Sequence, residues 1–122
     1  WDWWMRSHWF STELENDIEI SVWATEYHGF LDWPVDLQIN ISNNEHEVDF
    51  LIESGQGPYF QFYTSDIHPG IIYVEGYESC AWRDWKIDLN KETVQETQRS
   101  TTPYELLGFK LATKITSDFE FE

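Results

Sequence analysis

Histidine and carboxylate side chains are the first residues to test for chemistry, because they form most metal sites and most general acid–base pairs in proteins. The chain has four histidines, at positions 8, 28, 46 and 68, and 23 Asp and Glu residues. No two histidines are spaced as His-x-His or His-x-x-x-His, the patterns that place two imidazoles on one face of an element. His68 precedes Pro69-Gly70, so it is expected in a solvent-exposed turn. We therefore predict no metal and no cofactor.

Nucleophilic and phosphate chemistry also lack their usual sequence patterns. Cys80 is the single cysteine, and a lone cysteine in an aromatic run is usually a small core residue. The Gly55-Gln56-Gly57 segment is followed by Pro58 and a predicted strand, whereas a phosphate loop leads into a helix. Paired carboxylates suffice for a glycosidase, but 23 acids produce many accidental pairs. The sequence therefore favours a protein that is not an enzyme.

The acid excess is the strongest compositional signal and points to binding. Seven Lys and Arg against 23 Asp and Glu give a formal net charge of −16. Such a chain repels nucleic-acid phosphates and anionic membrane leaflets, and no apolar run approaches the roughly 20 residues that cross a bilayer. The same field accelerates encounters with a basic protein. A basic protein partner is therefore expected, with neither nucleic acid nor membrane.

Aromatic residues on the polar faces of predicted strands are the second signal. Four of these rings alternate with apolar neighbours and are therefore expected on outward faces: Trp23, Tyr59, Tyr63 and Tyr73. If their strands are neighbours, the rings form one patch. The N-terminal tryptophans are expected either to cover this patch or to leave it open.

Two further groups complete the predicted binding residues. Trp82 and Trp85 lie three residues apart in an extended segment, so one is expected in the core and the other at the surface, beside Arg83. Acids gather along one predicted hairpin and its approaches, from Asp32 to Glu53. The predicted partner-binding residues are Trp23, Asp36, Glu45, Glu47, Asp49, Tyr59, Tyr63, Tyr73, Trp82 and Arg83.

Apolar residues alternate with polar ones at period two, which predicts half-buried strands. The clearest runs begin near residues 18, 35, 48, 60, 72, 85 and 109, with a weaker one near 94. Asn43-Asn44 predicts the turn of a hairpin over 35–52, and Thr102-Pro103 begins one short helix near 103–108. Residues 1–17 are expected to form an irregular or short helical aromatic segment that packs on the sheet. We predict a single all-β domain over 1–122, an antiparallel barrel or curled sandwich of about seven or eight short, largely hairpin-connected strands.

A small, acidic, aromatic-rich chain with one cysteine is similar in style to bacterial immunity proteins. This similarity implies a protein that neutralises a basic partner, such as a toxin or nuclease, by covering its active surface. A carbohydrate-binding module that uses the exposed rings is the alternative, followed by a small barrel carrier or enzyme with a pocket containing His28. The single cysteine suits a reducing compartment, so a cytoplasmic location is expected, with secretion left open. The sequence leaves the oligomeric state open.

Overall fold

The computed structural model describes residues 5–28, 34–54, 59–78, 81–98 and 102–122. These residues form nine strands in two antiparallel sheets, and their helical segments are two short 3-10 turns, η1 (Glu15–Asp17) and η2 (Tyr104–Leu107). The all-β prediction is confirmed. The strands are β1 (Met5–Glu13), β2 (Glu19–Tyr27), β3 (Val35–Ser42), β4 (Glu47–Ser54), β5 (Phe60–Thr64), β6 (Ile71–Glu78), β7 (Ala81–Asp88), β8 (Thr93–Thr97) and β9 (Lys110–Lys114).

The first sheet has the order β1-β2-β3-β4 and is a simple meander. Its inward side chains follow the predicted alternation, since Ile20, Val22, Leu37, Ile39 and Ile41 are fully buried while their strand neighbours point outward. The β3–β4 hairpin forms as predicted. Its turn is fixed by the Asn43 Oδ1 atom, which accepts the backbone N–H groups of residues 45 and 46 at 2.9 and 2.7 Å.

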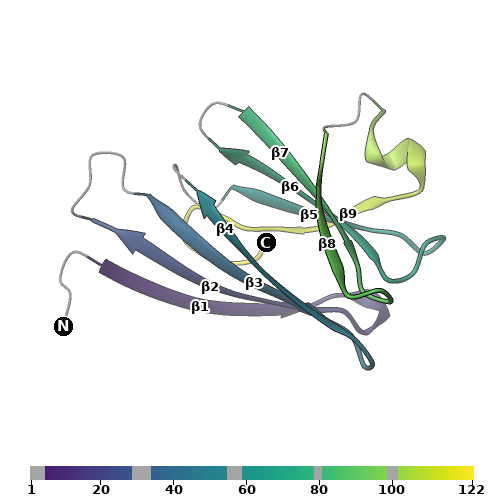
Figure 1. Cartoon of the computed structure of the whole chain (residues 1–122), viewed down its shortest axis with the longest axis horizontal. Coiled ribbons are helices and arrows are strands. Elements are labelled where there is room, and N and C mark those ends of the chain that lie inside the picture. The colour runs from purple at the N-terminus through teal and green to yellow at the C-terminus, as the bar shows by residue number, and fades with distance from the viewer. Residues whose placement is uncertain (1–4, 29–33, 55–58, 79–80, 99–101) are drawn as a thin grey trace.

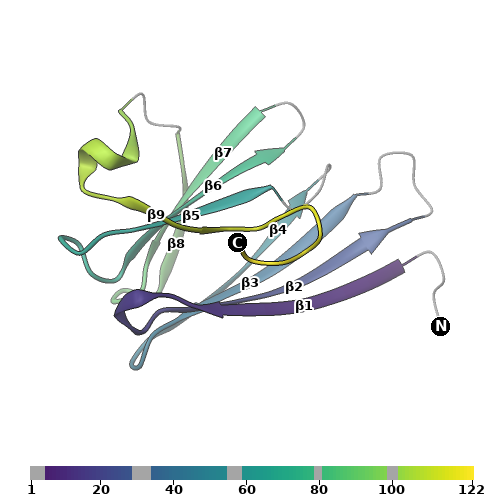
Figure 2. The ribbon, with the colours of Figure 1, turned by 180° about the vertical axis from the view of Figure 1, so that it is seen from behind.

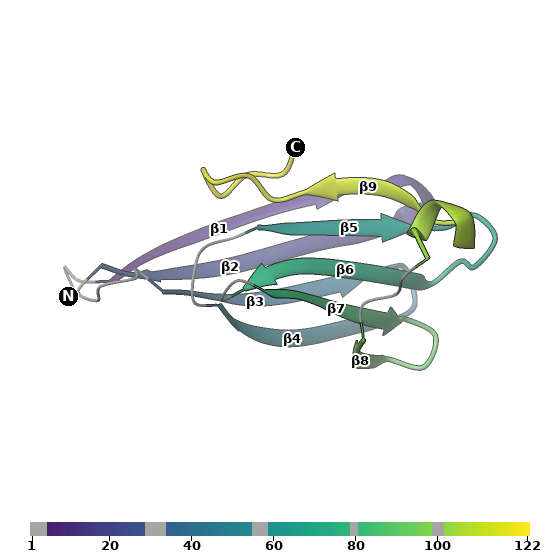
Figure 3. The same cartoon turned by 90° about the horizontal axis from the view of Figure 1, so that it is seen from above.

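The second sheet has the order β8-β7-β6-β5-β9 and lies over the first (Figures 1 and 3). Phe60, Phe62, Val74 and Ile87 from this sheet join the inward residues of the first sheet in one hydrophobic core. Among the described strands, hydrogen-bonded pairing stays within each sheet. The choice between a barrel and a curled sandwich therefore remains a prediction.

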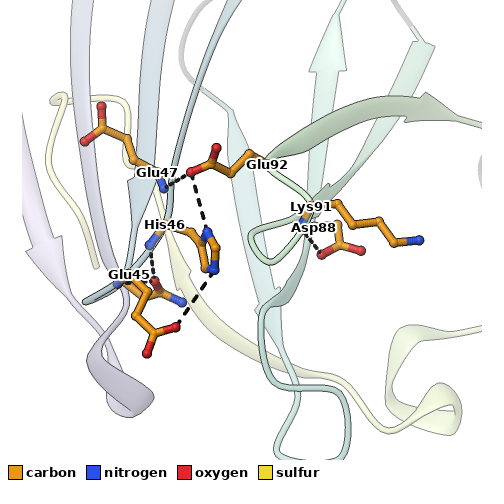
Figure 4. A network of polar contacts seen from close by, with 7 residues as sticks. Glu45, His46, Glu47, Asp88, Lys91 and Glu92 are labelled. Atoms are coloured by element: carbon orange, nitrogen blue, oxygen red, sulfur yellow. Dashed lines mark hydrogen bonds and ion pairs between the residues drawn. The ribbon is translucent and has the colours of Figure 1, made fainter.

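The two long sides of the core are closed by different means. On the β1 and β9 side, the C-terminal residues turn back on β9, with a bridge between Ile115 and Phe121, and Phe121 packs 5.2 Å from Phe10 (Figure 2). On the β4 and β8 side, the β3–β4 turn meets the β7–β8 turn. There His46 Nδ1 lies 3.5 Å from Glu92 Oε1 (Figure 4).

The N-terminal segment differs from the prediction, because Met5–Glu13 is an edge strand rather than a short helix or an irregular cover. Its alternation is hard to recognise because the inward positions include His8 and Thr12, both polar. Residues 1–4, with three of the N-terminal tryptophans, lie outside the described residues.

The predicted helix near 103–108 is a 3-10 turn over Tyr104–Leu107. Pro103 rather than Thr102 holds the N-cap position, so the expected capping box does not form. Gly108 ends the turn at φ 90°, a left-handed conformation that glycine adopts without strain. No helix within the described parts of the chain is long and apolar enough to span a membrane.

Candidate binding surface

The outer face of the β1–β4 sheet carries a row of exposed side chains that runs across all four strands. Register pairs Trp9 with Trp23, Trp23 with Gln38, and Gln38 with Leu51. Trp9, Trp23 and Leu51 are 64%, 54% and 54% exposed, although large apolar side chains are usually buried. We call these four residues the tryptophan row.

Small hydroxyl residues surround the two rings. Ser7 and Ser11 lie two positions from Trp9 on β1, and Ser21 and Thr25 lie two positions from Trp23 on β2, so all four share the face of the rings. Such short side chains cannot cover an indole. β5 to β9, η2 and the C-terminal segment all lie on the inner side of this sheet (Figures 1 and 2). The rings are therefore accessible within the described structure.

Carboxylates occupy the outer face beside this row. Asp36 pairs in register with Glu53 on one side of the row, and Asn40 pairs with Asp49 on the other. We define the acidic face as the tryptophan row together with Glu13, Glu19, Asp36, Glu47, Asp49 and Glu53. The described outward positions of β1 to β4 include no Lys or Arg.

Two of these carboxylates are held by neighbouring side chains. The Tyr27 hydroxyl donates to Asp36 Oδ2 at 3.1 Å, and Asn40 Nδ2 donates to Asp49 Oδ1 at 2.9 Å. Burial and the adjacent Asp36 carboxylate raise the pKa of Tyr27, so its hydroxyl stays protonated and continues to donate. The acidic face is thus partly preorganised for a cationic ligand.

The described cations lie elsewhere. Arg83, Lys86, Lys110 and Lys114 belong to the second sheet, and Lys91 lies in the β7–β8 turn with its side chain directed away from Glu45 and Glu47 (Figure 4). Arg6 is on β1, but its strand partner is Glu26, and both residues occupy positions on the inner face of the sheet. The carboxylates on the outer face of the first sheet therefore share that face with no described Lys or Arg.

The structure brings together four of the ten predicted binding residues. Trp23, Asp36, Glu47 and Asp49 share the acidic face. Glu45 lies at the edge of this face in the β3–β4 turn, where its Oε2 atom is 3.9 Å from His46 Nε2 (Figure 4). Asp32, which the sequence placed among the same acids, lies outside the described residues.

The four rings do not form one patch, because the strands that carry them are not all neighbours. Trp23 belongs to the first sheet, whereas Tyr63 and Tyr73 lie on the outer side of the second, where η2 covers them. Tyr104 of η2 packs 4.6 Å from Tyr63 and 4.9 Å from Tyr73 between ring centroids. η2 therefore covers Tyr63 and Tyr73, whereas Trp9, the described tryptophan of the N-terminal segment, is exposed on the first sheet.

The remaining predicted residues lie at one end of the second sheet. Trp82 is exposed and Trp85 is buried, which confirms that the two tryptophans occupy opposite faces. Arg83 bonds to Glu96, and its guanidinium carbon lies 4.9 Å from the centroid of the Trp85 ring. Tyr59 is exposed at the start of β5.

Two important members of the acidic face, Trp9 and Leu51, are absent from the sequence prediction. Trp9 belongs to the segment expected as a cover, and Leu51 is the single apolar residue at an outward position of β4, where its strand neighbours on that face are Asp49 and Glu53. One sequence signal points to this surface, since Arg6 is the only Lys or Arg before position 83. The first sheet is built from that part of the chain, so its outer face is left acidic.

A buried acid pair lies beneath η2 on the second sheet. Glu75 and Asp84 are register partners that are 7% and 1% exposed, and the Tyr104 hydroxyl donates to Asp84 Oδ2. Asp84 Oδ1 is buried and has no hydrogen-bond partner among the described residues. Burial, followed by the Asp84 hydrogen bond, raises the pKa of Tyr104 far above its ordinary value of 10.0.

His8, Glu26 and His28 form a second titratable cluster on the inner side of the first sheet. Glu26 Oε1 lies 2.6 Å from His8 Nε2 and 3.8 Å from His28 Nε2. The His8 ring stacks on Phe119, with centroids 4.2 Å apart, which ties the C-terminal segment to β1. Across the described ranges, no three His, Cys, Asp or Glu side chains are placed to hold a metal ion.

Comparisons with models of protein families, with curated proteins and with solved structures found no match to this chain.

Proposed function

We propose that this chain binds a basic protein through the acidic face and neutralises that partner by covering its cationic surface. The observation that supports this proposal is the tryptophan row, exposed and bordered by six carboxylates with no described Lys or Arg among them. Strong protein interfaces commonly combine central aromatic anchors with a polar rim. The acidic face has both parts.

The two parts of the surface have different roles in binding. The carboxylates attract a basic partner over long distances and accelerate encounter, an effect that rises at low ionic strength. Trp9 and Trp23 then provide contact area, and their faces accept Arg or Lys side chains in cation–π contacts. A partner that normally binds phosphates meets carboxylates in their place. A basic nuclease or toxin fits this description.

A charge-reversal experiment tests the proposal against a matched control. The face variant carries Glu47→Lys, Asp49→Lys and Glu53→Lys, three exposed outward positions of β4. The control variant carries Glu105→Lys, Asp118→Lys and Glu120→Lys, exposed positions on η2 and the C-terminal segment. Both variants have the same net charge, so a difference between them reports location rather than total charge.

The probes are purified basic nuclease domains of bacterial toxins, with binding and nuclease inhibition measured over a range of salt concentrations. We expect the face variant to associate at least about tenfold more slowly at low salt with any inhibited nuclease, and the control variant to remain close to wild type. Equal loss in both variants means that only net charge matters. That result, or inhibition that survives in the face variant, contradicts the proposal.

A further inference from the structure

A groove on the opposite side of the molecule is lined by two exposed aromatic rings. Tyr59 precedes β5 and Trp82 belongs to β7, and these residues are 51% and 44% exposed. The groove has a volume of about 480 Å³, within the range of about 300–1,000 Å³ that is typical of ligand sites. It lies on the second sheet, away from the acidic face.

The polar side chains of this groove suit an uncharged ligand. Gln61, Lys114, Thr116, Ser117 and Glu122 line it together with the rings. Lys114 Nζ lies 3.4 Å from Glu122 Oε2, so the cation and the anion in the lining neutralise one another. These two side chains are the charged ones among the described residues of the lining, so this part of the lining gives no preference to a charged molecule.

The combination of donors, acceptors and rings matches the chemistry of a sugar. A pyranose has apolar C–H faces, which pack on aromatic rings, and a rim of hydroxyl groups that both donate and accept hydrogen bonds. The Gln61 amide and the hydroxyls of Thr116 and Ser117 likewise donate and accept. We propose that this groove binds a neutral oligosaccharide, with Tyr59 and Trp82 as the stacking platforms.

The groove is open on its aromatic side, because Tyr59 and Trp82 are each about half exposed. An open groove accepts a chain of sugars that extends beyond it, whereas a small apolar ligand needs most of its surface covered. The proposal is independent of the acidic face, since the two surfaces use different sheets and share no residue.

The experiment titrates the whole chain with neutral cello-, chito-, xylo- and malto-oligosaccharides, followed by NMR and calorimetry. Trp82→Phe removes one indole N–H signal from the NMR spectrum, and this loss identifies the signal of Trp82 among those of the eight tryptophans. We expect one of these sugars to bind with Kd of about 1 mM or tighter and to shift that signal. We expect Trp82→Ala and Tyr59→Ala to weaken binding by about tenfold or more.

Trp23→Ala is the matched control, because it removes an equally exposed ring from the other sheet. Urea unfolding midpoints equal to that of wild type show that the variants are folded. Trp82→Phe keeps an aromatic ring, so it is expected to retain part of the affinity for the sugar. Absence of binding by all four sugars overturns the proposal. Binding that survives in Trp82→Ala and Tyr59→Ala, or that is lost in Trp23→Ala, also overturns it.

Discussion

At the scale of single residues, the Tyr104–Asp84 contact holds a buried carboxylate in place. The Asp84 side chain is almost fully buried, and its only described hydrogen-bond donor is the Tyr104 hydroxyl. A buried polar group without a hydrogen-bond partner is costly, so this contact is expected to stabilise the fold more than a surface bond does.

Tyr104→Phe is therefore expected to lower the free energy of unfolding by about 1.5–3 kcal/mol, because Asp84 loses its donor while staying buried. Urea unfolding at neutral pH measures the effect. Tyr59→Phe removes a hydroxyl from an exposed ring and is expected to change stability by less than about 0.5 kcal/mol. Similar stability of Tyr104→Phe and wild type contradicts the assignment of this contact.

The raised pKa of Tyr104 predicts a loss of stability at high pH. Above pH 10.0 the unfolded chain releases the phenolic proton while the folded chain retains it, so the folded state binds more protons and stability falls as pH rises. Urea unfolding between pH 9 and 11 measures this fall. Tyr104→Phe cannot ionise at this position, so its stability is expected to fall less steeply, and equal slopes exclude Tyr104 as a cause.

At the scale of elements, β6 and β5 approach closely at Gly76. A Cβ atom at this position would lie 2.3 Å from a ring carbon of Phe60, which is buried. Gly76→Ala is expected to destabilise the chain by about 1–3 kcal/mol, as overpacking usually does. Phe60→Leu in the same chain provides room, so the double variant is expected to lose less than the sum of the single changes in urea unfolding. Strict additivity would show that the ring is not the obstacle.

An exposed tryptophan on the first sheet, Trp23, and a buried tryptophan on the second sheet, Trp85, separate binding from stability. Trp23 faces solvent, so Trp23→Ala is expected to change stability by only about 0.2–1 kcal/mol, the size of a cross-strand contact. Trp85 is 6% exposed within the core, and Trp85→Ala is expected to cost about 3–5 kcal/mol. Thermal and urea unfolding compare the two. A large loss in Trp23→Ala would place that ring in the core rather than on a binding surface.

The elements also show why part of the fold can be predicted from sequence. The hairpin of β3 and β4 is predictable because Val35, Leu37, Ile39 and Ile41 alternate without interruption and Asn43 fixes the turn. β1 is not predictable in this way, because the polar residues His8 and Thr12 occupy inward positions and interrupt the alternation of apolar and polar residues. Period two assigns side chains to alternate faces, but it does not say which strands are neighbours. For this reason the sequence does not show that Trp23 lies on a different sheet from Tyr63 and Tyr73.

At the scale of the whole molecule, the position of the charges matters more than their total. The chain order assigns residues 5–54 to the first sheet and residues 60–114 to the second. Because Arg6 is the only Lys or Arg before position 83, this division leaves the first sheet acidic. The net charge is therefore evident from composition, whereas the acidic face and its tryptophan row depend on register.

The most direct test of this account is affinity capture from the source cells at low salt with three baits: wild type, the β4 face variant and the control variant of equal net charge. We predict that a basic protein is captured by wild type and by the control variant but not by the face variant. The purified form of that protein is expected to bind wild type directly, with an affinity that falls as the salt concentration rises. Trp23→Ala is expected to weaken the purified complex by about tenfold or more. Capture of the same proteins by all three baits, or of none by wild type, contradicts the acidic face as the binding surface.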